Sequence, residues 1–356
     1  MYLDQAFTLA FRGKASDILI KVGLPIKFRY LGQIVTLKGS KIVTEKMIDD
    51  WVEVTMPDFL KPVYEEKGDV DFAFQDKAGI RFRVNIFRQN SVQGFVARVL
   101  QNYIRSVEEL QLPSVLNTIP QFKGGLIFVT GTTGSGKSTT LAAIVQKMNT
   151  DYPFHVMTIE DPIEYVYEDE KSIINQREVG VDTKSFTQGL RGALRQNPDV
   201  IVLGELRDRE AAYEALKASE TGILVMTTLH TCNAVESLNR FLSFFPTSDR
   251  EILADFLSRN IRMCISQRLL PTADRKSMIV ASEIMVANQR VKEIIKENQS
   301  FQEIYDVIEA SNESYRMHSF DQSLIYLLKK GYITEQHAVA HATSPTNLQV
   351  MLSGVG

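Results

Sequence analysis

The chain has 356 residues, of which 44% are hydrophobic and 23% are charged, so it can bury a full core and divide into two or three domains. Its formal net charge of -3 gives no general reason to expect a nucleic acid as the main partner. Cys232 and Cys264 are the only cysteines of the sequence, which excludes a four-cysteine zinc module.

The apolar runs and the N-terminus bear on where the protein resides. No apolar run approaches the ~20 residues that span a bilayer. The first residues include Asp4, Arg12 and Lys14, and they lack the uninterrupted apolar core of a signal peptide. We therefore expect a cytoplasmic protein.

Residues 1–110 are predicted to form a separate α/β domain. Helices are expected up to Gly13 and over residues 44–54, and strands over residues 18–22, 26–30, 34–37, 70–74, 82–87 and 94–100. The alternation of polar and apolar residues around Phe82 places Arg81, Arg83 and Asn85 on one face of a strand. This domain therefore presents arginines on one side of its sheet.

A segment with two prolines and a glycine pair, residues 111–124, is predicted to be an interdomain linker with a short helix near residues 114–117. From residue 125 to residue 280, strands and helices alternate, which predicts a mostly parallel sheet covered on both faces. The strands are expected at residues 126–130, 155–159, 199–203 and 223–228, and the helices after residue 138 and at residues 185–196 and 208–219. The predicted fold class is α/β.

Residues 281–356 are predicted to form a C-terminal helical region. Amphipathic helices are expected at residues 289–298 and 301–310. Ser319 and Gln322 form a capping box for a further helix that runs to Lys330, and Thr334 can cap the next one. This region offers no catalytic group of residues.

The segment Gly131–Ser138, with the sequence GTTGSGKS, lies between a buried strand and a helix, as a phosphate-binding loop must. Lys137 is placed to reach the terminal phosphates, and the Ser138 hydroxyl can ligate Mg2+. The residues predicted to bind the nucleotide are Thr132, Thr133, Gly134, Ser135, Gly136, Lys137, Ser138 and Thr139.

Polar residues follow each of the four apolar strands, and ligands of an open α/β sheet bind at these carboxyl ends. Glu205 follows the third strand and is placed to hold Mg2+ directly or through a water. For the group that activates the attacking water, the candidates are Glu160, Asp161 and Glu164. We favour Glu164, which is presented from a loop after a proline. This assignment assumes that the four strands are neighbours in the sheet.

Two further groups complete the expected site. His230 follows the fourth strand and can sense the γ-phosphate or orient Glu164. Phosphoryl transfer often uses an arginine supplied from elsewhere, and the face with Arg81 and Arg83, near Arg88 and Arg98, is the richest source. A solvated surface is the alternative interpretation of these arginines.

Four ordered motifs resemble the Walker A, Asp box, Walker B and His box motifs of the secretion and pilus motor ATPases. They are Gly131–Ser138, Thr158–Tyr165, the strand that ends in Gly204 and Glu205, and Thr228–Thr231. The resemblance implies an N-terminal PAS-like domain, a RecA-like P-loop ATPase domain and a hexameric ring that hydrolyses ATP with Mg2+.

The same resemblance implies a role for each site residue. Glu164 would be the catalytic base, Glu205 would stand at Mg2+, and His230 would be the His-box residue. Arg83 and Arg98 would reach the ATP of a neighbouring subunit.

Within this family, the chain is most similar to the type IV pilus retraction ATPases, and the similarity covers nearly its whole length. That implies pilin disassembly, twitching motility, an inner-membrane pilus platform protein as partner, and a peripheral place at the inner membrane through such partners. A partner retraction ATPase stays an open possibility. Pilus assembly motors usually carry a longer N-terminal region and a tetracysteine zinc site, so retraction is favoured.

One stretch departs from the retraction motors. Their Ala-Ile-Arg-Asn-Leu-Ile motif is replaced by Gln289-Arg290-Val291-Lys292-Glu293-Ile294-Ile295, which keeps helical character without the motif. The alternatives are an accessory paralogue, a type II or type IV secretion ATPase, an ATP-binding scaffold without turnover, or a RecA-like motor driven by nucleic acid. The balanced charge and the lack of an aromatic and basic stripe argue against the last.

Overall fold

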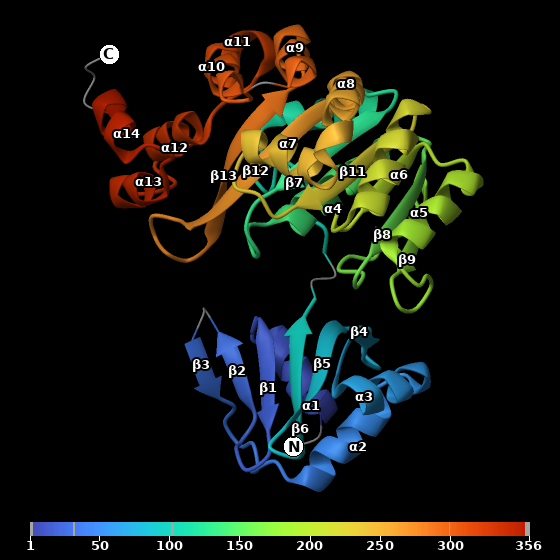
Figure 1. The fold of residues 1–356 in the computed structure, drawn as a ribbon. Helices are drawn as coiled ribbons and strands as arrows, with labels where there is room; N and C mark the ends of the chain where they lie inside the picture. The colour runs from blue at the N-terminus through green and yellow to red at the C-terminus, as the bar shows by residue number, and fades with distance from the viewer. Residues whose placement is uncertain (1–2, 31–32, 101–102, 299, 353–356) are drawn as a thin grey trace. The chain divides into compact units, whose positions relative to one another are not determined.

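A computed structural model describes residues 3–30, 33–100, 103–298 and 300–352. The chain forms two compact units (Figure 1). The first contains Met1–Tyr103 together with the short segment Pro162–Val166, and the second contains Ile104–Asp161 and Tyr167–Gly356. None of the described helices combines the length and apolar character needed to cross a membrane.

The first unit is an antiparallel sheet of six strands, in the order β3-β2-β1-β6-β5-β4, with helices packed on it. Its elements are α1 (Leu3–Arg12), β1 (Asp17–Lys21), β2 (Lys27–Tyr30), β3 (Gln33–Thr36), α2 (Glu45–Thr55), η1 (Asp58–Leu60), α3 (Lys61–Lys67), β4 (Asp69–Gln75), β5 (Arg81–Gln89) and β6 (Val92–Val99). The expected helices and strands of this unit are confirmed.

Alternation along β5 builds the core of the first unit. Phe82, Val84 and Ile86 are fully buried, whereas the residues between them are partly exposed. The ring of Phe82 stacks on that of Phe7 from α1, with 4.2 Å between ring centroids. Arg81 and Arg83 therefore lie on the opposite face of the strand, where both are partly exposed, as the sequence predicts.

The second unit contains a sheet of seven strands in the order β13-β12-β7-β11-β10-β8-β9. Every neighbouring pair is parallel except β12 with β13. Its elements up to the sheet's last strand are η2 (Ser114–Gln121), β7 (Gly125–Thr130), α4 (Lys137–Asp151), β8 (His155–Glu160), β9 (Ile173–Glu178), α5 (Phe186–Ala193), η3 (Leu194–Gln196), β10 (Val200–Leu203), α6 (Arg209–Glu220), β11 (Leu224–Leu229), α7 (Ala234–Ser243), η4 (Thr247–Asp249), α8 (Arg250–Asn260), β12 (Ile261–Pro271) and β13 (Met278–Val286). The α/β class with a mostly parallel sheet is confirmed.

Helices cover both faces of this sheet (Figure 1). Successive residues of the central strand β7 feed two cores, because Phe128 packs with α5 to α8 whereas Ile127 and Val129 pack with α4 and η2. All six residues of β7 are buried. This burial on both faces explains why the central strands are continuous apolar runs in the sequence.

The segment predicted as a linker, residues 111–124, belongs instead to the core of the second unit. Leu116 and Ile119 of η2 are buried against the sheet, and the division between the units falls at Tyr103 and Ile104. Prolines mark this segment correctly as irregular, but irregular backbone can still bury apolar side chains.

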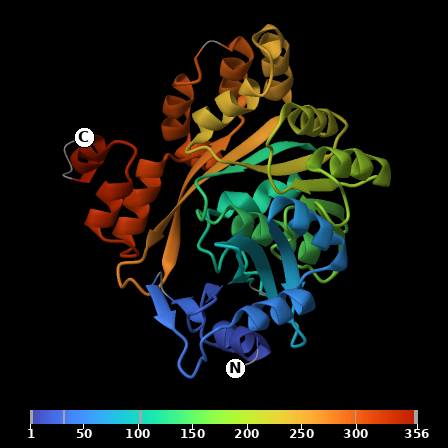
Figure 2. The same ribbon diagram turned by 60° about the horizontal axis from the view of Figure 1, so that its bottom comes forward.

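Helices follow the sheet, namely α9 (Gln289–Glu297), α10 (Glu303–Ala310), α11 (Asn312–Tyr315), α12 (Phe320–Lys329), α13 (Glu335–His341) and α14 (Pro345–Leu352). The capping box of Ser319 and Gln322 and the cap of Thr334 are confirmed. Figure 2 shows α12 to α14, in red, beside the β12–β13 hairpin, with which they share a core.

The structure corrects the predicted start of the helical region at residue 281. Residues 281–286 belong to β13, which pairs with β12 over its whole length. Residues Ser282 and Glu283 interrupt the apolar run of β13, yet both are buried. The sequence pattern therefore hides a strand whose polar residues find partners inside the molecule.

Candidate active site

The phosphate-binding loop connects β7 to α4 as the sequence predicts. Residues 132–139 lie in this loop and in the first turn of α4. Gly136 precedes the helix in a left-handed conformation, with φ of 94°. Gly131 has φ of 145°, and a Cβ atom there would lie 2.4 Å from Ser135 Oγ and 2.5 Å from the Gln267 carbonyl oxygen. Only glycine fits at this position without a shift.

The loop has the polar groups that a phosphate requires. Lys137 is 9% exposed, and its Nζ donates to the carbonyl oxygens of Gly131 at 2.9 Å and Thr132 at 3.0 Å. Ser135 Oγ is buried without a hydrogen-bond partner in the described part of the chain. The first N–H groups of α4 also have no acceptor within the helix. A bound phosphate would satisfy such donors.

Two neighbours of the loop were not predicted. Gln267 of β12 donates from Nε2 to Thr140 Oγ1 of α4 at 2.7 Å, and both side chains are buried. A cavity of about 780 Å³ borders the loop. Its lining includes Arg105, Glu109, Thr139, Thr272, Val280 and Tyr332. No motif could reveal these residues, because they come from segments far apart in the sequence.

The four strands with polar tips are neighbours, as the sequence analysis assumed. They follow one another in the order β7-β11-β10-β8. The tips are also linked to each other, since Thr228 Oγ1 donates to the Gly204 carbonyl oxygen at 2.5 Å and Leu206 N donates to the Thr228 carbonyl oxygen at 3.2 Å. The residues that follow β10 and β11 are thereby held side by side.

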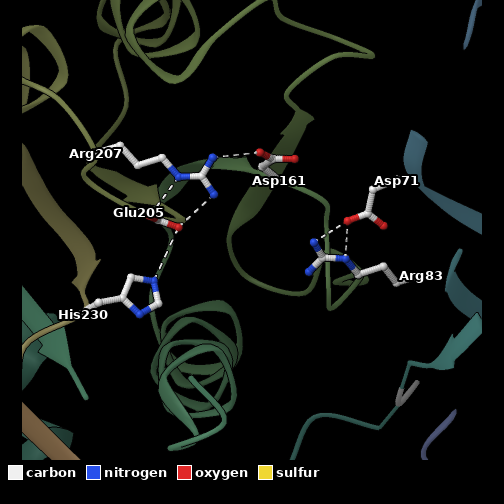
Figure 3. A network of polar contacts seen from close by, with 6 residues as sticks. All are labelled: Asp71, Arg83, Asp161, Glu205, Arg207 and His230. Atoms are coloured by element: carbon white, nitrogen blue, oxygen red, sulfur yellow. Dashed lines mark hydrogen bonds and ion pairs between the residues drawn. The ribbon is translucent and has the colours of Figure 1, made fainter. Parts of the chain in front are cut away.

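Glu205 is the centre of a network of charged groups (Figure 3). Arg207 lies between two carboxylates, with its Nε 2.8 Å from Glu205 Oε1 and its Nη1 3.6 Å from Asp161 Oδ2. His230 approaches Glu205 from the other side, with 3.7 Å between Nε2 and Oε2. Burial disfavours the charge on Glu205, but the hydrogen bonds and charge of Arg207, together with His230, outweigh it and lower the pKa of Glu205.

This network favours the ionised form of Glu205, and a metal ion there would share the carboxylate with the Arg207 guanidinium, which bonds to both of its oxygens. Among the residues that the structure describes, no three His, Cys, Asp or Glu side chains gather closely enough to hold a metal ion by themselves. Mg2+ in nucleotide sites usually keeps several waters and takes only one or two protein ligands besides the phosphates. The exposed Ser138 hydroxyl and the Glu205 carboxylate fit that demand. Arg207 is the partner of Glu205 that sequence reasoning missed, although it stands only two residues further on.

The acidic residues at the end of β8 and after it have different partners and belong to different units. Glu160 Oε1 accepts from Thr158 Oγ1 at 2.7 Å, and Asp161 pairs with Arg207. Glu164 is half-buried in the segment Pro162–Val166, which belongs to the first unit, where Arg81 Nη2 donates to the Ile163 carbonyl oxygen at 3.0 Å. Glu164 thus belongs to one unit, and Lys137 and Glu205 belong to the other.

Arg83 and Arg98 stand directly opposite each other on β5 and β6 of the first unit. Arg83 Nε donates to Asp71 Oδ2 at 2.8 Å. Arg98 Nε donates at 2.9 Å to Asp17 Oδ1, and Asp17 also pairs with Arg29 at 3.3 Å. Both predicted arginines therefore have carboxylate partners within their own chain.

Comparison with known proteins places these residues in context. The family model of the type II/IV secretion system proteins matches residues 1–299. A twitching motility protein of Neisseria gonorrhoeae is 40% identical over 301 residues, covering 85% of this chain and 80% of that protein. The type IV pilus retraction ATPase PilT of Pseudomonas aeruginosa is 37% identical over 347 residues, covering 97% of this chain and all of that protein.

A solved structure is similar over the same length. The crystal structure of the pilus retraction motor PilT with bound ADP has a TM-score of 0.90 and 38% identity, and the match covers 98% of this chain and 99% of that one. The loop Gly131–Ser138 therefore stands in a fold that holds a nucleotide in a relative.

Proposed function

The chain belongs to the type II/IV secretion system protein family, and on that premise we propose that it is a hexameric motor ATPase that powers the retraction of a type IV pilus. The observation that carries this proposal is its similarity to retraction motors over nearly the whole length of both chains. The adjacent strand tips with Lys137, Glu205 and His230 support ATP hydrolysis as the source of the work.

The second unit supplies the groups that bind the phosphates of ATP. Lys137 and the N–H groups of the loop neutralise the phosphate charge. Ser138 and Glu205 would hold Mg2+, which when bound offsets charge on the phosphates. Arg207 keeps Glu205 ionised for this purpose. The cavity lined by Arg105 and Tyr332 has the size and position to take the nucleoside.

The first unit supplies the groups that complete hydrolysis in this proposal. Glu164 accepts a proton from the attacking water. Arg83 and Arg98 act on the ATP of a neighbouring subunit, and each must then exchange its aspartate for phosphate oxygens. The Arg83–Asp71 pair is partly exposed, and surface ion pairs contribute about 0–1 kcal/mol, so breaking it costs little. Asp17 is buried, but it keeps Arg29 as a partner when Arg98 leaves.

The proposed partners follow from the family role. They are other copies of this chain in a homo-hexamer, an inner-membrane pilus platform protein and, where the system has one, a partner retraction ATPase. We place the protein in the cytoplasm, peripheral at the inner membrane through these partners. No nucleic acid is expected.

The first experiment compares ATP hydrolysis by Glu164→Gln and Glu168→Gln. Glu168 is an exposed glutamate that lies four residues after Glu164 in the chain, so its variant controls for the loss of one negative charge. A general base contributes about 10²–10⁴-fold to the rate, and we expect a loss of that order for Glu164→Gln alone. Equal rates for both variants and the unmodified protein would show that Glu164 is not the base.

The second experiment tests the assignment of Arg98 to a neighbouring site. Lys137→Ala and Arg98→Ala are each expected to abolish most ATP hydrolysis. Mixed rings contain some interfaces with both Lys137 and Arg98 intact, so mixing the two variants should restore part of the activity. Light scattering with Mg-ATP should show a hexamer. No restoration on mixing, or a fully active monomer, would rule out action between subunits.

Genetic and biochemical tests separate the alternatives. Deletion of the gene should leave cells that bear pili but do not twitch, whereas cells without pili would contradict retraction. ATP hydrolysis that rises severalfold with single-stranded DNA, in a salt-sensitive manner, would favour a nucleic-acid motor instead.

A further inference from the structure

Glu283 is the most deeply buried Asp or Glu among the described residues. Its pKa is raised, and nothing in the proposed mechanism uses it. It lies in the middle of β13 and is 1% exposed. Burying a carboxylate costs free energy unless it is hydrogen-bonded. Its Oε1 accepts from the backbone N–H of Ala234 at 2.8 Å. Ala234 is the first residue of α7, and its N–H has no acceptor within that helix.

The loop that leads from His230 into α7 is fastened to the first turns of this helix. The N-cap Asn233 Oδ1 accepts from Glu236 N at 2.7 Å. Glu236 Oε2 accepts in return from Cys232 N at 3.0 Å. The hydroxyls of Thr231 and Ser237 lie 2.7 Å apart. These bonds tie residues 231–237 together. His230 directly precedes this segment in the chain, so a shift of the first turn of α7 would be passed on to the backbone of His230.

The position of His230 matters because its distance from Glu205 is near the limit at which the two side chains interact. The 3.7 Å between His230 Nε2 and Glu205 Oε2 is longer than a hydrogen bond but short enough for an ion pair. A displacement of about 1 Å would either form or break this interaction, and such shifts can cost about 10²-fold in rate.

We propose that Glu283 is a positioning residue for the ATPase reaction, which holds the first turn of α7 and thereby sets the place of His230 beside Glu205. The inference rests on the proposed ATP hydrolysis and not on pilus retraction. Glu283 touches no predicted site residue and acts only through the backbone of α7.

The surroundings of Glu283 make this anchor sensitive to pH. Burial raises its pKa to about 7, while the Ala234 N–H and Arg268 of β12 oppose the rise. Asp321 of α12 and Glu236 of α7 add to it, and Tyr305 of α10 also faces this carboxylate. An ionised carboxylate accepts a stronger hydrogen bond than a neutral acid does. The anchor should therefore weaken as the pH falls through about 7.

The test compares Glu283→Ala, Glu283→Gln and Ser282→Ala by steady-state ATP hydrolysis and by binding of a fluorescent ADP analogue. Ser282 is the matched control, because it is the next residue of β13 but bonds to His318 and Ser323 on the other face. We expect Glu283→Ala to lower kcat about tenfold or more, which is about 1.4 kcal/mol, with KM and ADP affinity changed less than about twofold. Glu283→Gln should recover only part of this loss, because its neutral amide oxygen still accepts from Ala234 N but more weakly than an ionised carboxylate does.

The pH profile gives a readout that a merely structural residue would not change. The unmodified protein should show a transition in kcat near pH 7 that Glu283→Gln lacks. If Glu283→Ala does not fold, this comparison alone decides. The proposal is overturned by an unchanged profile in Glu283→Gln, by a folded Glu283→Ala with normal kcat, or by equal losses in Ser282→Ala. An unmodified protein without ATPase activity would instead overturn the proposed function.

Discussion

Gly131→Ala is expected to damage the nucleotide-binding loop by a steric route that the structure makes quantitative. The backbone φ of 145° at this position lies where L residues are strained by about 1–3 kcal/mol. The new methyl group would also overlap Ser135 Oγ and the Gln267 carbonyl oxygen. Relieving such an overlap in a packed region costs about 1–3 kcal/mol more. The sum is roughly 2–6 kcal/mol.

Gly134→Ala is the matched control for this prediction. Gly134 lies in the same loop with φ of 80°, but nothing stands within 4 Å of a Cβ atom there. Its substitution carries the backbone strain alone, which is about 1–2 kcal/mol. The difference between the two variants therefore measures the overlap with Ser135 and Gln267.

Both variants should be compared by urea denaturation without nucleotide and by titration with a fluorescent ADP analogue. We expect Gly131→Ala to be the less stable by about 1–3 kcal/mol and to bind ADP about tenfold more weakly than Gly134→Ala, or worse. Equal stability and equal ADP affinity of the two variants would refute this account of the loop, because it assigns the larger effect to contacts that only position 131 makes.

Three further predictions concern the second unit. Arg207→Ala should raise the pKa of Glu205. In the unmodified protein the ionised Glu205 stabilises the fold above its ordinary pKa of 4.5, and this stabilisation is lost as the pH falls through the lowered value. Urea denaturation over an acidic pH series should show the variant losing stability at a higher pH than the unmodified protein. Phe241→Ala should cost about 3–5 kcal/mol, because its buried ring packs on Phe128, whereas the exposed Tyr213→Ala should change the free energy of unfolding by less than about 0.5 kcal/mol. Burial lowers the pKa of His318 from 6.5 to about 4. The free energy of unfolding should therefore be highest above pH 6.5 and fall by about 3 kcal/mol as the pH drops from 6.5 to about 4. His318→Gln should remove this pH dependence, and a variant with the same pH profile of stability as the unmodified protein would contradict the prediction.

Much of the fold could be predicted because its signals are local. Alternation around Phe82 and the continuous apolar run of β7 reveal the strands, since each pattern reflects which faces are buried. The capping box at Ser319 reveals a helix start for the same reason. The strand β13 was missed, because Ser282 and Glu283 interrupt its apolar run although both are buried with partners from other elements.

The candidate site divides in the same way. The loop around Lys137 is a contiguous motif, and the acid Glu205 and His230 follow recognisable strands. Arg207 and Gln267 could not be assigned from sequence, because their roles depend on which side chain from another strand or helix they meet. No local pattern encodes such a meeting.

The two faces of β13 should govern how chains of this family diverge. Successive residues of a strand point to opposite sides, so Ser282 bonds to His318 and Ser323, whereas Glu283 bonds to the start of α7. Over evolutionary time, position 282 should change together with His318, and position 283 together with the start of α7. Gained or lost residues should collect in the turn 272–277, because a slip of one residue in the hairpin would exchange the partners of both positions at once.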